Sequence, residues 1–193
     1  MGEREGERKL AVALSGGGHR ACLFALGALL YLVDAGKGAA ISSIASVSGG
    51  SLANGVVAQE LDLTAAAPGD LDPFAARAAG QITARGTLFG SRWTTAYLLA
   101  VALAVVTSLA VPWFLPVAGA LKVVLVLAGL LLTAWLLAAR GRVCALAFDR
   151  TLFRPAGRST PLAGIRKGLD HVFCATDLHA GEHVYFSGEF VYS

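Results

Sequence analysis

Charged residues are scarce in this sequence of 193 residues. Only 15% of the residues are charged, against about 25% in an average soluble domain, while 55% are hydrophobic. The deficit lies mainly in residues 94–139, where Lys122 is the only charged residue in 46 positions. Such a stretch indicates membrane-spanning structure. The remainder has the character of an ordinary α/β domain.

Cysteine is scarce as well. The three cysteines, Cys22, Cys144 and Cys174, are odd in number and show no C-x-x-C spacing. This pattern indicates neither a disulfide framework nor a zinc site, and it fits a reducing, cytosolic environment. We therefore expect no metal and no other cofactor.

The N-terminus lacks the signals for secretion and for lipid attachment. Residues 1–9 are rich in Glu and Arg, and the apolar run that follows, residues 10–14, is too short for a signal peptide. Gly6 stands where a myristoylation signal needs Ser or Thr. The net charge is +3, but the arginines cluster beside the apolar stretch, so nucleic acid is not an expected partner. Membrane attachment is expected from the interior of the chain.

The apolar stretch predicts a transmembrane helical hairpin over residues 93–139. Two spans fit, residues 94–115 and 117–139, because about 22 residues at about 1.5 Å rise cross a hydrocarbon core of about 30 Å. Pro112 and Pro116 are expected to mark the turn. A buried helical pair in a soluble protein and a re-entrant hairpin are the alternatives. The first would leave no polar face to meet water.

The flanks of this stretch predict its orientation. Three tryptophans, Trp93, Trp113 and Trp135, are spaced as interfacial aromatic belts require, and Lys122 can reach the interface on the turn side. Basic residues stand on both flanks: Arg85, Arg92, Arg140, Arg142 and Arg150. The positive-inside rule then places both flanks in the cytoplasm, so we expect a two-span membrane protein.

Two strand, glycine turn and helix units precede the hairpin. Residues 9–14 predict a buried strand, which ends at three glycines and is followed by a helix over residues 20–33. Residues 41–47 predict a second strand, which turns into a helix that ends near Leu61. Two such units in series indicate neighbouring parallel strands. Residues 64–72 are rich in Ala, Pro, Gly and Asp and predict a loop.

The second glycine turn has the pattern of a nucleophile elbow. Ser48 stands between a predicted strand and a predicted helix and is followed by Gly49 and Gly50. A sharp turn at this point is expected to lift the Ser48 hydroxyl clear of the sheet. Ser46 takes the place of the usual first glycine of G-x-S-x-G. A serine that merely caps the helix is the alternative.

The first glycine turn, Gly16 to Gly18, exposes consecutive backbone N–H groups at the same edge of the sheet. Such a nest can hold an oxyanion, and acyl transfer needs an oxyanion site as well as a nucleophile. The loop also matches the dinucleotide pattern G-x-G-x-x-A, but the second strand ends in Val47 and Ser48 rather than in an acidic residue. No Lys-Ser or Lys-Thr pair follows, so a Walker loop is absent.

SGGGHR, followed about 30 residues later by SVSGGS and then by CATDLHAGEHVYF, resembles the patatin-like phospholipase family. The resemblance implies a three-layer α/β fold with a mostly parallel sheet, a Ser–Asp dyad, and hydrolysis of fatty acyl esters in membrane lipids. It implies that Ser48 is the nucleophile and that Gly16, Gly17 and Gly18 form the oxyanion loop. Arg20, Gly49 and Gly50 correspond to the supporting positions of the two motifs.

The sequence departs from that family in four respects. Ala21 and Ser46 replace glycines of the two motifs, the hairpin is an insertion, and the D-G-G or D-G-A turn that carries the dyad aspartate does not occur. We therefore expect residues 1–90 to be the N-terminal part of the catalytic domain and residues 140–193 to be its continuation. The dyad aspartate is expected beyond residue 193, so the domain is incomplete here.

Other groups in the chain could act as the base. Asp177 is expected to be structural, whereas His171, His179 or His183 could complete a triad, and His19 is expected to be a loop side chain. The prediction is a cytosol-facing lipid acyl hydrolase, whose partners are a lipid substrate and the bilayer. The alternative is a non-catalytic membrane protein of the same fold that binds or scaffolds lipid.

Overall fold

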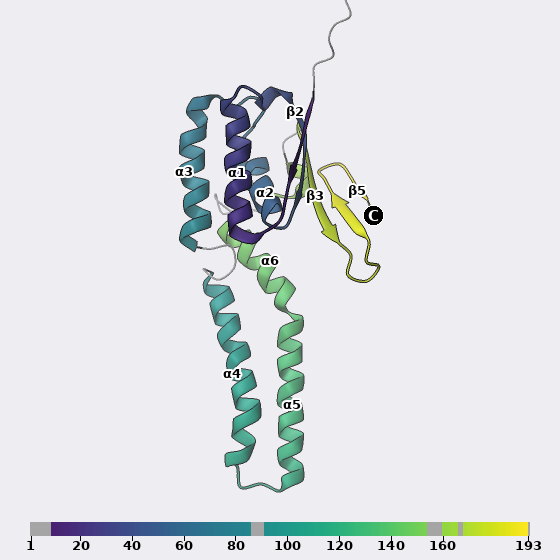
Figure 1. Cartoon of the computed structure of the whole chain (residues 1–193). Helices are drawn as coiled ribbons and strands as arrows, with labels where there is room; N and C mark the ends of the chain where they lie inside the picture. The colour runs from purple at the N-terminus through teal and green to yellow at the C-terminus, as the bar shows by residue number, and fades with distance from the viewer. Residues whose placement is uncertain (1–8, 86–90, 154–159, 166–167, 193) are drawn as a thin grey trace, which may run out of the picture. The chain divides into compact units, whose positions relative to one another are not determined.

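A computed structural model describes residues 9–85, 91–153, 160–165 and 168–192 (Figure 1). The chain divides into two compact units. Residues 1–84 and 152–193 form the sheet unit, and residues 85–151 form the hairpin unit. The sheet unit is therefore built from two segments that are far apart in the sequence.

The sheet unit contains a five-stranded sheet of mixed direction. Its strands follow the order of the chain: β1 (Leu10–Leu14), β2 (Ile41–Val47), β3 (Asp170–Thr176), β4 (His183–Phe186) and β5 (Val191–Tyr192). The first three strands are parallel, which confirms the predicted parallel neighbours. The last two are each antiparallel to the strand before, so only the first half of the sheet is parallel.

Helix α1 (Gly18–Asp34) connects β1 to β2, with a short 3₁₀ turn, η1 (Gly38–Ala40), before β2, and helix α2 (Gly49–Glu60) follows β2. A second such turn, η2 (Leu162–Gly164), precedes β3. Helix α1 ends as predicted, because Gly36 adopts a φ of 69° and its N–H donates to the carbonyl of Val33.

Helix α3 (Pro68–Arg85) corrects the loop predicted for residues 64–72. Proline suits the first turn of a helix because its missing N–H has no partner there. The carboxylate of Asp70 accepts a hydrogen bond of 3.0 Å from the N–H of Ala67, which stabilises this start. Arg77 in α3 forms an ion pair of 2.7 Å with Glu60 of α2.

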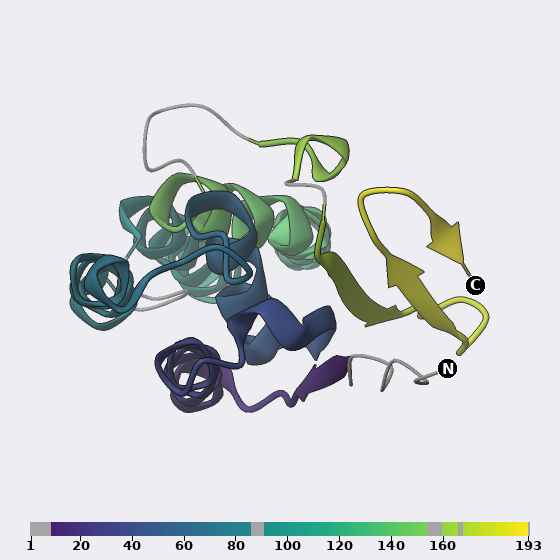
Figure 2. The same ribbon diagram turned by 90° about the horizontal axis from the view of Figure 1, so that it is seen from above.

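The core of the sheet unit lies between the sheet and its helices. Helix α2 packs on β1, β2 and β3, α1 packs on α2, and both helices lie on one side of these strands (Figure 2). Large apolar side chains fill this space and are almost fully buried: Leu26, Leu29, Ile44, Val56 and Val57. In β1, Ala11 and Ala13 are exposed while Leu14 is buried, so the predicted buried strand is covered on one face only. A third layer is not formed by the described residues.

The hairpin unit consists of α4 (Arg92–Phe114), α5 (Gly119–Ala138) and α6 (Arg140–Thr151). Helices α4 and α5 pack along each other, and the Tyr97 hydroxyl donates to the carbonyl of Leu136 at 3.0 Å. Pro112 lies inside the last turn of α4 rather than in the turn between the helices, which corrects the prediction for this residue. The described residues contain two helices that are long and apolar enough to cross a membrane.

Candidate active site

Ser48 lies at a sharp turn from strand to helix. Strand β2 ends at Val47 and α2 begins at Gly49, so Ser48 is the single residue between them. Its backbone has φ 53° and ψ −120°, and no other described non-glycine residue has a positive φ. Such a conformation costs about 1–3 kcal/mol and clusters at functional sites. Ser48 is exposed and its side chain makes no capping hydrogen bond, which argues against a simple helix cap.

The glycine loop lies directly beside Ser48. A Cβ atom added to Gly16 would lie 3.0 Å from the Cβ of Ser48 and 3.5 Å from its Oγ. Gly17 and Gly18 have φ values of 137° and 66°, which L side chains rarely adopt, and α1 begins at Gly18. The structure thus brings Gly16 into contact with Ser48 and exposes the loop backbone at the same edge of the sheet.

The two glycine turns fit closely against each other. A Cβ atom on Gly49 would collide with the carbonyl oxygen of Gly18. A Cβ atom on Gly50 would lie 2.7 Å from the carbonyl oxygen of Leu14 and 2.8 Å from that of Ser15. Both positions require glycine because backbone atoms cannot move aside cheaply. This packing fixes the glycine loop relative to Ser48.

Arg20 occupies an exposed position in α1, and no described residue forms an ion pair with it. His19, its neighbour, is half-buried at the start of the same helix. The structure therefore places both residues next to the glycine loop without assigning either a role in catalysis.

Asp177 stabilises the hairpin between β3 and β4. Its carboxylate accepts a hydrogen bond of 2.8 Å from the N–H of His179, and its carbonyl accepts one of 2.8 Å from the N–H of Gly181. His179 and His183 are exposed in the same hairpin. Asp177 thus has the structural role expected for it, because its carboxylate and its carbonyl both hold this turn.

A buried polar network lies behind the elbow. The Asn54 side chain in α2 donates from Nδ2 to Ser46 Oγ at 2.9 Å and to the Ile44 carbonyl at 3.3 Å. Ser46 Oγ donates to the Val172 carbonyl at 3.1 Å, and Asn54 Oδ1 lies 2.6 Å from His171 Nδ1. Burial lowers the pKa of His171 from 6.5 to about 4, with the charge of Asp62 opposing the shift.

This network corrects the idea that His171 could act as a base on Ser48. His171 pairs with Ile44 in the sheet, four residues before Ser48, and its ring bonds to Asn54 instead. Asn54 was missed in the sequence analysis. The available signal was a single amide side chain within the apolar run of α2, between Ala53 and Val56.

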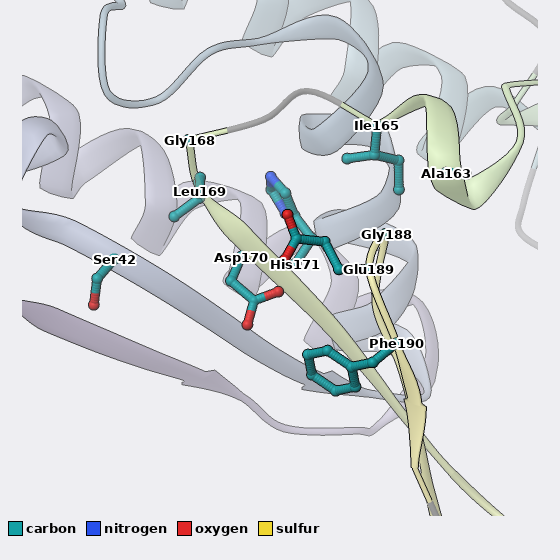
Figure 3. A pocket seen from close by; sticks show the side chains of 10 residues that line it. All are labelled: Ser42, Ala163, Ile165, Gly168, Leu169, Asp170, His171, Gly188, Glu189 and Phe190. Atoms are coloured by element: carbon teal, nitrogen blue, oxygen red, sulfur yellow. The ribbon is translucent and has the colours of Figure 1, made fainter.

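A cavity of about 320 Å³ opens at the other end of β3 (Figure 3). Side chains that surround it include those of Asp170, His171, Glu189 and Phe190. Strand β3 begins at this cavity, whereas Ser48 follows the opposite, C-terminal end of the parallel strand β2. The cavity is therefore separate from the elbow.

Comparisons with known proteins define the fold. No family model matches the chain, and no curated protein matches it. Among solved structures, the chain is similar to human GIVD cytosolic phospholipase A2 in complex with a methyl gamma-linolenyl fluorophosphonate inhibitor. The TM-score is 0.55 at 16% sequence identity, and the match covers 98% of this chain. This chain spans 24% of the length of that protein, so the likeness shows a shared fold over about a quarter of it.

Proposed function

We propose that this protein is a patatin-like serine acyl hydrolase that acts on the fatty acyl esters of membrane lipids. The observation that carries the proposal is the strained elbow at Ser48, which lies against a loop of three glycines. A shared fold with a solved phospholipase supports a lipid hydrolase. No cofactor takes part in the proposed reaction.

The proposed chemistry runs in two halves. The Ser48 oxygen attacks the ester carbonyl while its proton passes to a base, and backbone N–H groups of Gly16, Gly17 and Gly18 bind the oxyanion. The intermediate collapses to an acyl-enzyme, and the leaving alcohol takes the proton from the base. Water, activated by the same base, then releases the fatty acid and restores the Ser48 hydroxyl.

The base in this proposal is an aspartate that lies outside residues 1–193. A serine hydroxyl is a weak nucleophile without a base, and two candidates within the chain, His171 and Asp177, hydrogen-bond to Asn54 and to the N–H of His179. No D-G-G or D-G-A turn occurs in the sequence. The 193-residue chain alone is therefore expected to be inactive, and extension through such a turn is expected to restore hydrolysis.

Helices α4 and α5 are proposed to anchor the catalytic domain, of which residues 1–90 and 140–193 are two parts, in the bilayer. Large apolar side chains cover the outside of both helices, including Leu99, Val106 and Leu131. The Lys122 Nζ lies 6.0 Å from the ring centre of Trp113, and the Arg150 guanidinium lies 4.6 Å from the ring centre of Trp93. Such cation and tryptophan pairs suit the two membrane interfaces. The anchor would raise the local concentration of lipid substrate.

Hydrolysis of phospholipid vesicles tests this function in the complete protein. Ser48→Ala should abolish fatty acid release, because only the attacking oxygen is removed, while Ser51→Ala on the next turn of α2 should keep it. Membrane association should be unchanged in both variants. Full activity in Ser48→Ala would refute the mechanism. A folded wild-type protein that binds these vesicles without hydrolysing them would favour the non-catalytic, lipid-binding alternative.

A further inference from the structure

The strained backbone at Ser48 has to be held by its surroundings. A non-glycine residue stays in such a conformation only where neighbouring structure over-determines it. The chain before Ser48 belongs to β2, and the chain after it belongs to α2. Any group that ties α2 back to β2 therefore acts on the conformation of the residue between them.

Asn54 makes this connection. It lies six residues after Ser48, and its Nδ2 reaches back to Ser46 Oγ at 2.9 Å and to the Ile44 carbonyl at 3.3 Å. Its Oδ1 lies 2.6 Å from Nδ1 of His171 on β3. One side chain thus joins the helix after the elbow to the strand before it and to the next strand of the sheet.

The direction of every hydrogen bond in this network follows from its acceptors. The Ile44 carbonyl can only accept, so the Asn54 atom facing it must be the NH₂ group. Asn54 Oδ1 then accepts from His171, which requires a proton on Nδ1. Ser46 Oγ accepts from Asn54 and donates to the Val172 carbonyl. Each of these donors therefore has an acceptor.

Burial makes the network difficult to replace by water. Asn54 is 0% exposed, Ser46 is 2% exposed and His171 is 5% exposed. Removing one partner leaves a buried polar group unsatisfied, which favours rearrangement of the adjacent backbone. Ser46 also stands where the elbow motif usually has glycine, and its hydroxyl is the group that meets Asn54.

We propose that Asn54 is a positioning residue of the active site, which holds the Ser48 elbow through Ser46, Ile44 and His171. The inference rests on the proposed function, because it assigns these residues an effect on the reactivity of Ser48. It also assigns a role to Ser46, whose hydroxyl links Asn54 of α2 to the Val172 carbonyl of β3.

The test compares Asn54→Leu with wild type in the complete protein, using the rate of Ser48 modification by a fluorophosphonate probe. Asn54→Leu should slow modification and lower kcat about tenfold or more, with KM unchanged, because small displacements of a reacting group carry costs of this size. Gln59→Leu, on the same helix but outside the network, should leave both rates unchanged. Equal rates in folded Asn54→Leu and wild type would overturn the proposal.

Two further variants keep the test decisive if Asn54→Leu does not fold. His171→Leu should slow modification of Ser48, whereas His171→Asn should restore much of the rate, since its amide nitrogen can donate in place of Nδ1. Combined with Ser46→Ala, His171→Leu should cost less than the sum of the two single changes, because both act through one network. Additive effects, or equal rates for His171→Leu and His171→Asn, would overturn the proposal.

Amide hydrogen exchange separates failure of this inference from failure of the proposed function. The network predicts faster exchange at residues 49–52 in Asn54→Leu than in Gln59→Leu, with α1 unchanged. This readout does not require activity. If wild-type Ser48 is unreactive while exchange behaves as predicted, the proposed function fails and the network stands. Unchanged exchange in Asn54→Leu would contradict the network directly.

Discussion

Acid is expected to destabilise the sheet unit through His171. Burial lowers the pKa of this side chain from 6.5 to about 4, and the negative charge of Asp62 only partly opposes the shift. Between these two pH values the unfolded chain binds a proton that the folded chain does not, so stability falls as the pH drops from about 6.5 to about 4. A shift of this size corresponds to about 3 kcal/mol of stability.

Urea unfolding in detergent micelles, followed by far-UV circular dichroism at pH 7.0, 5.5 and 4.5, measures this contribution. His171→Asn is the control because its side chain does not titrate. Subtracting the unfolding free energy of this variant from that of wild type cancels effects of the carboxylates near His171, which include Asp62, Asp170 and Glu189. The free energy of unfolding of wild type should fall more steeply than that of His171→Asn, by about 2–3 kcal/mol over this range. Parallel curves would refute the buried, neutral state of His171.

Two other perturbations follow from the same geometry. Gly49→Ala should destabilise the elbow by about 1–3 kcal/mol and abolish hydrolysis, because its Cβ would collide with the Gly18 carbonyl. Gly27→Ala in α1 is the control, because its Cβ would meet no atom within 4 Å; it should retain activity and gain up to about 1 kcal/mol in stability. Thermal unfolding measures both variants, and equal effects would contradict the close fit of Gly49 against Gly18. A cysteine replacing Lys122 should react with a membrane-impermeant reagent from outside intact cells, whereas one replacing Arg92 should not, and labelling at Arg92 would reverse the proposed orientation.

The site's local parts could be predicted because each is encoded in a short segment. Glycines follow both strands closely, at Gly16 and at Gly49 after Ser48, and a sequence of this kind favours a tight turn from strand to helix. The start of α3 was missed because proline and aspartate are common both in loops and in the first turn of a helix. Pro68 and Asp70 occupy first-turn positions of α3. Composition alone therefore predicted a loop where a helix begins.

The network behind the elbow could not be predicted from the sequence. Asn54 and His171 are 117 residues apart, and their contact depends on the parallel register that pairs His171 with Ile44. That register is reached only after the chain has passed through the hairpin unit and returned to the sheet unit. Ser46 could be identified only as a departure from a motif, because its partners on α2 and β3 are not adjacent in sequence.

Active-site labelling with a fluorophosphonate probe tests the central claim most directly. The probe phosphonylates a serine only where the hydroxyl is activated and an oxyanion site receives the phosphoryl oxygen. In the complete protein, mass spectrometry should locate the adduct on Ser48, and Ser48→Ala should remove it. Modification of another serine, or no modification of a protein shown to be folded, would contradict the assignment of Ser48 as the nucleophile.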